Sequence, residues 1–397
     1  MISKTNIINA SVNSQHLPLS ALLALSIAAF LTLLTEIMPA GLLLYISEGL
    51  DVSESIAGQF ITVYAVGALI AAIPMTVFTQ GIRRRPLLLT AILGFALVNL
   101  ITAVSDNFIL SIGARFFAGI FGGLVWSLLA GYAVRMSPSQ LSGRAIAIVS
   151  AGATIALVLG VPFGSVLGRI IGWQGTFGLM SALAILLIIW IISIVPDFPG
   201  QSRELRQSLI SVFNKTGICA VLFVVMSFVL AHNILYIYIE PFLTMSSLSA
   251  NVHIVLFVFG FGSIIGLWFI GVMVDRKLQF LAVASIIIFG LSAFLLGLWG
   301  HFEQIVYPSV FIWGLSIGGF ATITQTALSR FSGNSFDVAQ SMYTTGWNIA
   351  VACGGVVGGI LLDTIGPSSF AWAVILVLVF SLVGTVFAMN KKLSKMN

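Results

Sequence analysis

The sequence predicts an all-α membrane protein with twelve transmembrane helices in two pseudo-symmetric six-helix bundles. Its composition, its run of apolar segments and the distribution of its basic residues predict this fold class. Of the 397 residues, 59% are apolar and 7% are charged, whereas soluble domains average roughly 45–50% apolar and about 25% charged. A chain with so few polar side chains cannot cover its surface in water, so lipid is its natural solvent.

Twelve apolar segments are long enough to cross a bilayer, which takes about 20 mostly apolar residues. They lie at 19–45, 57–79, 87–104, 108–134, 144–168, 175–195, 216–242, 252–274, 279–298, 305–328, 338–362 and 368–389. The segments between them are short and polar, because unpaired backbone groups cannot lie in hydrocarbon. The first segment is too long for the core of a cleaved signal peptide, so we expect it to be the first membrane helix.

The basic residues predict the orientation. With the N-terminus inside, fifteen of the seventeen Lys and Arg residues fall in inner segments, while Arg169 lies in an outer loop and Arg115 within a helix. Basic residues concentrate in cytoplasmic loops. The sequence therefore predicts a multi-pass inner-membrane protein with both termini in the cytoplasm. The same distribution explains the net charge of +5 without a nucleic-acid partner.

A polar stretch in the middle of the chain separates six predicted helices from six. The expected organisation is a cytoplasmic tail at 1–18, a six-helix bundle at 19–195, a cytoplasmic linker at 196–215, a second six-helix bundle at 216–389 and a tail at 390–397. Gly164 and Gly358 are 194 positions apart, and Pro39 and Pro241 are 202 apart. Glycine and proline residues that recur at a similar sequence separation indicate an internal repeat. Transporters are commonly built from such repeats, with the site between the halves.

Two loops carry similar motifs. Residues 80–86 read Gln-Gly-Ile-Arg-Arg-Arg-Pro, and residues 271–277 read Gly-Val-Met-Val-Asp-Arg-Lys. Both resemble the loop signature of the major facilitator superfamily, Gly-x-x-x-Asp-Arg followed by Gly and basic residues. The residues that carry the resemblance are Arg83, Arg84 and Arg85 in the first copy and Gly271, Asp275 and Arg276 in the second. The first copy has Gln80 where the family usually has Asp.

The resemblance implies that these loops form a charge latch that holds the halves closed on the cytoplasmic side. With Gln80 in place of that Asp, the first copy departs from the family pattern on which the latch depends. The alternative is that the three arginines of the first loop only satisfy the positive-inside rule.

The fifth predicted helix carries a small residue at every fourth position from 152 to 168. This spacing places them on one face, where a neighbouring helix can approach closely. The Gly160-x-Pro162-x-Gly164 core resembles the antiporter signature of exporters in the superfamily. Tight helix packing alone would also explain the stripe.

Two ionisable residues are predicted inside the first bundle. Arg115 lies about ten Å from the outer end of its helix at the ordinary helical rise, and Glu36 lies at a similar depth. A charge at such depth is costly and indicates a functional role. We expect the two to lie at one cavity and to interact. The segment around Arg115 also resembles the helix-four motif of the family, whose Arg is linked to proton movement.

A carboxyl beside a guanidinium can serve as a proton switch. Burial favours its neutral form, and the neighbouring positive charge favours its ionised form. The hypothesis is that Glu36 and Arg115 couple proton movement to cargo. The alternative is a structural ion pair that does not titrate during transport.

Several polar side chains are candidates for lining a substrate cavity. His232, Tyr236 and Glu240 recur every four residues, and a polar stripe in a membrane helix is expected to face a cavity. Glu240 could equally be an interfacial residue. The further candidates are Trp126, which shares a helix face with Arg115, and Gln325, Trp347 and Asn348. Packing or an interhelical hydrogen bond is the alternative role for the last three.

No other chemistry stands out. The sequence has no phosphate-binding loop followed by Lys and Ser or Thr, no clustered metal-ligand set and no nucleophile with a base at a workable spacing. We therefore expect neither an enzyme nor a bound cofactor or metal.

The whole chain resembles the twelve-helix drug/proton antiporter-1-like group of the major facilitator superfamily. The runs at 35–42 and 238–242 resemble its sugar-efflux branch, and those at 55–59 and 172–174 its purine-nucleoside-efflux branch. The resemblance implies a secondary active transporter that exports a sugar, nucleoside or drug-like solute by proton antiport with alternating access. Its expected partners are protons, the small-molecule substrate and the lipid bilayer, with the protein a monomer. The alternative is a proton-independent facilitator or importer on the same fold.

Overall fold

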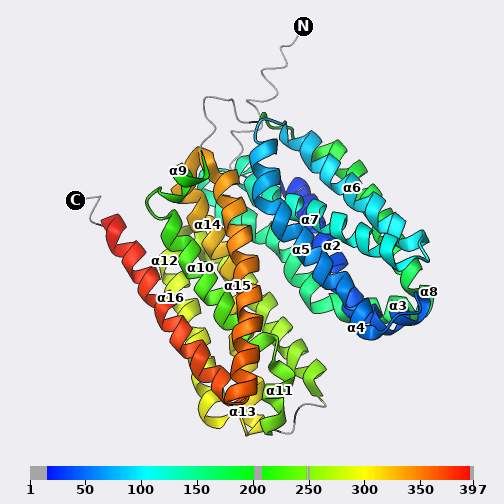
Figure 1. Cartoon of the computed structure of the whole chain (residues 1–397). Helices are drawn as coiled ribbons and strands as arrows, with labels where there is room; N and C mark the ends of the chain where they lie inside the picture. The colour runs from blue at the N-terminus through cyan, green and yellow to red at the C-terminus, as the bar shows by residue number, and fades with distance from the viewer. Residues whose placement is uncertain (1–15, 201–207, 247, 249–250, 394–397) are drawn as a thin grey trace. The chain divides into compact units, whose positions relative to one another are not determined.

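The computed structural model describes residues 16–200, 208–246, 248 and 251–393 (Figure 1). Within these ranges the chain is helical and contains no strand. Most of the predicted N-terminal tail, part of the predicted linker and the last four residues lie outside the described residues. The structure divides into two compact units, Met1–Gln207 and Ser208–Asn397.

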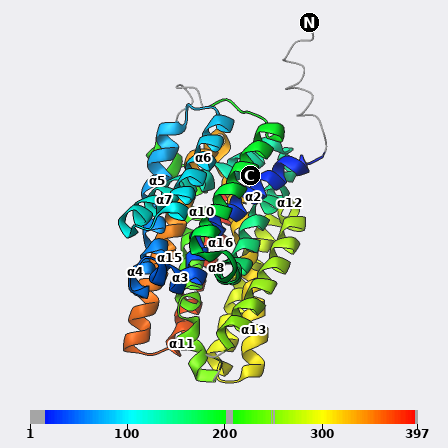
Figure 2. The same ribbon diagram turned by 90° about the vertical axis from the view of Figure 1, so that its right-hand side faces the viewer.

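The first unit is built from five long helices and several short ones. They are α2 (Leu19–Ile37), η1 (Met38–Leu42), α3 (Leu43–Gly49), α4 (Glu54–Ala57), α5 (Gln59–Thr79), α6 (Arg84–Val104), α7 (Phe108–Met136), η2 (Ser139–Leu141) and α8 (Ser142–Ile194). The helix α7 lies between α5 and α6, and α8 packs on α2 and α6 (Figure 2). Aliphatic and aromatic side chains of these helices form a common core, and Asn99 and Arg115 are buried as well.

The second unit repeats this plan. Its elements are α9 (Leu209–Phe213), α10 (Ile218–Tyr236), α11 (Ile239–Leu243), η4 (Thr244–Ser246), α12 (Val252–Trp299), α13 (Glu303–Gly318), α14 (Phe320–Ser332), η6 (Gly333–Ser335), α15 (Phe336–Thr364) and α16 (Ser369–Leu393). Within this unit α10 packs against both α15 and α16 (Figure 1).

The described helices account for twelve crossings. Nine stretches are long and apolar enough to span a membrane, and the bent α5 makes ten. Two of these stretches, Val252–Trp299 with 48 residues and Glu303–Thr364 with 62, are each long enough for two crossings of the hydrocarbon layer, which is about 30 Å thick. The predicted fold class is therefore confirmed.

The long helix α8 contains a reversal of direction. Gly172 has a φ of 73° within it, a left-handed conformation that glycine adopts without steric cost. The helix α12 is interrupted at Lys277, whose φ and ψ are −127° and 34°. Trp313 contacts Phe259 on one side of this interruption and Phe289 on the other, so the two halves of α12 lie side by side.

Glycines set the closest helix approaches, and they do so at equivalent places in the two units. A Cβ on Gly119 of α7 would lie 2.0 Å from the carbonyl oxygen of Tyr64, and one on Gly314 of α13 would lie 2.2 Å from that of Phe259. Members of each equivalent pair, Gly119 with Gly314 and Tyr64 with Phe259, are 195 residues apart. The internal repeat therefore appears in the packing: equivalent glycines contact equivalent carbonyl groups in the two units. Glycine is needed at these positions because only glycine permits backbones this close.

Equivalent glycine contacts also show which residues correspond in the first long helix of each unit. A Cβ on Gly164 of α8 would lie 2.8 Å from the carbonyl oxygen of Met38, and one on Gly358 of α15 would lie 3.2 Å from that of Ile234. Met38 and Ile234 are 196 residues apart. Two positions earlier, Glu36 of α2 therefore corresponds to His232 of α10.

Candidate functional site

Arg115 of α7 is completely buried in the first unit, with no exposed side-chain surface. Its Nη2 donates to the carbonyl oxygen of Thr35 at 2.9 Å, and its Nε to that of Phe60 at 3.3 Å. The guanidinium lies over the rings of Tyr64 and Phe177, at 4.9 and 5.5 Å from their centroids. Arg115 therefore joins α2 and α5 to α7 through hydrogen bonds and cation–π contacts.

Pro39 explains why the carbonyl of Thr35 is open to Arg115. In a continuous helix the N–H of residue 39 would donate to that carbonyl, but proline has no N–H. The helix α2 accordingly ends at Ile37 and continues as the 3-10 turn η1. A charged side chain thus completes the hydrogen bonding of a broken helix inside the membrane.

Glu36 lies one residue from the end of α2 and is half-buried. Its charge and that of Arg115 interact electrostatically. Within the described part of the chain, however, the two side chains form no ion pair within 4.0 Å, and the Nη1 of Arg115 has no hydrogen-bond partner. The helix break thus holds a carboxyl near a guanidinium that keeps one donor unused.

The glycines on the Arg115 face of α7 do not line a cavity. A Cβ on Gly122 would lie 2.2 Å from the hydroxyl of Tyr64, so α5 covers this face. Trp126, further along α7, is half-buried and packs against the core of the unit. The structure thus assigns the glycines a packing role, because they let α5 approach.

The Gly160-x-Pro162-x-Gly164 motif lies against the same helix break. A Cβ on Gly160 would meet the side chain of Ile37 at 2.5 Å, and Gly164 faces the backbone of Met38. The side chain of Pro162 lies outside the described residues. The motif therefore packs α8 onto the junction of α2 and η1, close to Glu36.

An aromatic cluster occupies the equivalent region of the second unit. His232 stacks on Tyr236 and on Phe259, with ring centroids 5.0 and 5.7 Å apart, and lies 5.3 Å from Trp313. Phe289 stacks on Trp313 in turn. The Nδ1 of His232 and the Nε1 of Trp313 are buried without a hydrogen-bond partner among the described residues. Two polar atoms are thus held inside an otherwise apolar cluster.

Glu240 does not belong to this cluster. The helix α10 ends at Tyr236, and Glu240 is the second residue of the separate short helix α11, with its side chain exposed. The predicted stripe through His232, Tyr236 and Glu240 assumed one unbroken helix, so the prediction that the three share a face is wrong for Glu240. Pro241 is the physical reason, since it cannot continue α10.

The remaining cavity candidates have other surroundings. Asn348 is half-buried, and its Nδ2 donates to the carbonyl oxygen of Thr344 on its own helix at 2.8 Å. Trp347 is half-buried against Tyr343, and Gln325 on α14 is also half-buried. Their roles in binding stay predictions.

Asp197 supplies an acidic partner to the first loop motif. The carboxylate of Asp197 lies 2.6 Å from the Nε of Arg83 and accepts from the backbone N–H of Arg85 at 3.1 Å. Arg84 is buried, and its Nη2 donates to the carbonyl oxygen of Gln80. Gln80, which stands in the family's Asp position, therefore accepts this hydrogen bond with its backbone carbonyl, and the acidic side chain comes from the segment after α8.

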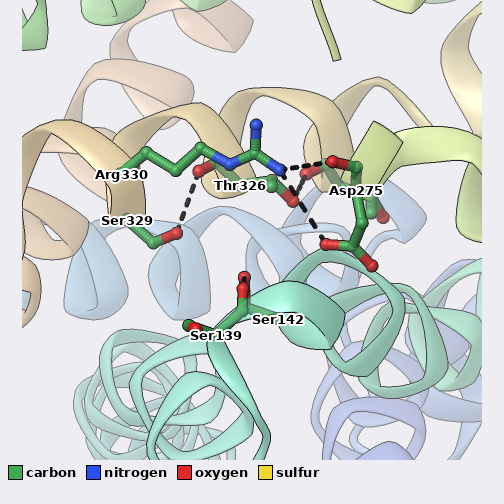
Figure 3. A network of polar contacts seen from close by, with 7 residues as sticks. Ser139, Ser142, Asp275, Thr326, Ser329 and Arg330 are labelled. Carbon is green, nitrogen blue, oxygen red and sulfur yellow. Dashed lines mark hydrogen bonds and ion pairs between the residues drawn. The ribbon is translucent and has the colours of Figure 1, made fainter. Parts of the chain in front are cut away.

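The second loop motif is arranged differently. Asp275 lies opposite Arg330 of α14, whose Nη2 donates to the Asp275 carbonyl oxygen at 2.9 Å and lies 4.0 Å from its carboxylate (Figure 3). Gly271 is buried one turn earlier on α12, and Arg276 is exposed. Each loop thus contains a charge pair within its own unit.

The comparisons with known proteins place the chain in a family. The Major Facilitator Superfamily model matches residues 25–336, which is more than half of the chain. This chain belongs to the major facilitator superfamily. It is therefore a multi-pass membrane transporter rather than an enzyme.

Curated relatives of this superfamily member are named for efflux. It is 25% identical over 355 residues to a "Probable sugar efflux transporter" of Helicobacter pylori, covering 89% of this chain and 90% of the relative. It is 26% identical over 352 residues to the "Purine ribonucleoside efflux pump NepI" of Escherichia coli, covering 88% and 89%.

Solved structures of other transporters share the superfamily fold. The proton:xylose symporter XylE matches with a TM-score of 0.75 at 12% identity over 94% of this chain and 95% of that one. The human organic anion transporter MFSD10 matches with a TM-score of 0.72 at 14% identity over 93% and 98%. Identities this low support the fold and not the cargo.

Sequence reasoning missed three residues that the fold brings to these sites. Tyr64 and Phe177 enclose the guanidinium of Arg115, and Asp197 pairs with the first loop. For Asp197 a signal was present, since it is an acid directly after the sixth predicted helix. The two aromatic residues carry no such signal among the 30 Phe and 7 Tyr of this transporter.

Proposed function

We propose that this transporter exports a small polar solute, a sugar or a purine nucleoside, in exchange for protons. The observation that carries the proposal is the half-buried Glu36 beside the buried Arg115 at a broken helix. Relatives named for sugar and purine ribonucleoside efflux, similar over nearly the whole chain, support the direction and the cargo class. The halves would alternate access around a central site.

Glu36 would carry the proton. When ionised, it offsets the charge of Arg115, and when protonated, it leaves that charge without a counter-ion. Binding of the cargo would then weaken binding of the proton, and binding of the proton would weaken binding of the cargo by the same factor. The fixed positive charge of Arg115 would determine how strongly Glu36 holds its proton. Arg115 would stay in place, because backbone carbonyls and aromatic rings hold its guanidinium.

The proposal also includes the orientation of the protein in the membrane. With the basic loops on the cytoplasmic side, both termini lie in the cytoplasm of a bacterial cell and Glu36 lies toward the outer half of the first bundle. Protons from outside would reach it when the site is open to that side, and antiport requires that they leave when it opens to the cytoplasm. The protein would work as a monomer in the inner membrane, and lipophilic drug-like cations are the further cargo class to examine.

Transport by purified protein in proteoliposomes tests the proposal. An imposed pH gradient is expected to drive accumulation of one class among sugars, purine nucleosides and lipophilic cations, with proton flux in the opposite direction. The Glu36→Gln variant is expected to lose both the accumulation and the proton flux. Cargo flux that ignores the pH gradient in the wild type and persists in the variant would identify a facilitator instead.

A further inference from the structure

A cavity of about 500 Å³ lies within the second unit, among α10, α12, α14 and α16. Its buried lining is mostly apolar: it includes Val221, Val224 and Ile323, together with the hydroxyl-bearing Thr324 and Thr385. Its exposed lining includes Lys277, at which α12 is interrupted, and the preceding Arg276. The cavity thus combines an apolar depth with a cationic mouth.

The cations at the mouth are available to a ligand. The side chains of Arg276 and Lys277 form no hydrogen bond or ion pair with any other residue that the structure describes. Arg330 also lines the cavity, but it is engaged by Asp275 (Figure 3). Lys215, at the same end of the unit, donates to Ser335 at 2.8 Å. The mouth therefore carries two positive charges without a protein partner.

The mouth lies at the boundary of the hydrocarbon layer. Lys277 divides the 48-residue α12 into two lengths that each suit one crossing, so the interruption falls where the helix leaves the membrane. Lipid headgroups occupy this depth. Cationic pockets between membrane helices at such a boundary suit phosphate headgroups.

We propose that this cavity is a binding site for an anionic phospholipid. The phosphate headgroup contacts Arg276 and Lys277, where charge-assisted hydrogen bonds form readily. The first part of an acyl chain enters between α10 and α14 along Val221, Val224 and Ile323. The volume falls within the range of roughly 300–1,000 Å³ that is usual for small-molecule sites.

Charge should decide which lipid binds. An acyl chain gains little by moving from lipid to protein, because the two environments are about equally apolar. The preference for an anionic headgroup then depends on the two free cations. A water-soluble phosphate would use the same cations but would leave the apolar depth unused.

Native mass spectrometry of the full chain, titrated with phosphatidylglycerol or phosphatidylcholine, tests the proposal. The wild type is expected to retain one phosphatidylglycerol in preference to phosphatidylcholine. Arg276→Gln and Lys277→Gln are each expected to weaken that binding about fivefold, and the double variant roughly thirtyfold. Arg169→Gln removes an exposed charge outside the cavity and serves as the control, with no change expected.

Filling the cavity separates a lipid from a free phosphate. Ala327→Phe leaves every charge in place but occupies the apolar depth, so it is expected to abolish phosphatidylglycerol retention, and Arg276→Lys is expected to preserve it. Competition by inorganic phosphate together with full retention in Ala327→Phe would overturn the lipid assignment in favour of an anion site. Equal retention of both lipids by the wild type and the double variant would show a non-specific lipid layer and overturn the site itself.

Discussion

Equivalent positions in the two units carry different chemistry. The first unit places Glu36, Tyr64 and Arg115 around a broken helix, whereas the second places His232 and Phe259 at the positions equivalent to Glu36 and Tyr64. Val310, buried and 195 residues from Arg115, stands where the first unit has its guanidinium. One packing register therefore supports a charged site in one unit and an aromatic site in the other.

This difference in side chains leads us to expect different roles for the two units. Glycine contacts between backbones fix the helices in the same way in both units, so the side chains between them can differ without changing the fold. A carboxyl and a guanidinium suit proton exchange. Aromatic faces suit stacking of planar or ring-shaped solutes. We expect proton coupling to depend on the first unit and cargo preference on the second.

The largest expected effect is a different loss of function when each of two equivalent residues, one in each unit, is substituted. Glu36→Gln is expected to reduce gradient-driven transport to the level of empty liposomes, because the carboxyl that titrates is gone. His232→Phe keeps the stacking on Phe259 and is expected to retain coupling while changing the apparent affinity for cargo. Transport assays under an imposed pH gradient measure both. Loss of coupling in His232→Phe with Glu36→Gln unaffected would reverse the division.

The second expected effect concerns the stability of the first unit. Arg115→Ala removes two hydrogen bonds from a charged donor, each worth about 1.5–3 kcal/mol, and leaves the Thr35 carbonyl unpaired. We expect the free energy of unfolding to fall by roughly 3 kcal/mol.

Val310→Ala at the equivalent place is the matched control, and we expect it to cost about 1 kcal/mol, as for the loss of a small apolar group. Thermal unfolding of the purified variants in detergent compares them. Equal losses would mean that Arg115 contributes no more to the fold than an apolar residue.

The third expected effect distinguishes two glycines at equivalent positions, Gly164 of α8 and Gly358 of α15. A Cβ at Gly164 meets the backbone of Met38, whereas one at Gly358 first meets the ring of Tyr238 at 2.6 Å. Backbone cannot move aside as a side chain can, so Gly164→Ala is expected to cost about 1–3 kcal/mol and Gly358→Ala less.

Thermal unfolding also measures this pair. Gly119→Ala and Gly314→Ala, which both meet backbone, are expected to destabilise the protein equally. A larger cost for Gly358→Ala than for Gly164→Ala would contradict the packing argument.

The smallest expected effect concerns the loops. The Arg83 side chain is 71% exposed in its pair with Asp197, and exposed ion pairs contribute about 0.2–1 kcal/mol. Asp197→Asn is therefore expected to lower stability by less than about 1 kcal/mol, with the difference vanishing at high salt. Asp275→Asn in the other unit is the comparison, and unfolding at low and high salt measures both. A large loss that salt does not change would show that the pair is shielded from solvent.

Periodicity and charge in the sequence predicted the twelve crossings and placed Glu36 and Arg115 within apolar segments. These features depend on segment length and on the cost of charge in hydrocarbon, which are local properties of the chain. The glycine spacing likewise predicted a packing face on the fifth helix, which the structure places against α2 and η1. The place of Glu240 could not be read in this way, because the end of α10 interrupts the helical period on which the prediction relied.

Composition, apolar periodicity and the placement of basic residues by themselves determined that this protein is a helical protein that crosses a membrane many times. The tertiary structure alone decided which groups meet: that Arg115 bonds the carbonyl released by Pro39, that Asp197 faces the first loop, and that His232 lies among aromatic rings. The reason is physical. Burial and length act on each segment separately, whereas hydrogen bonds and ring contacts depend on the register between helices far apart in the chain.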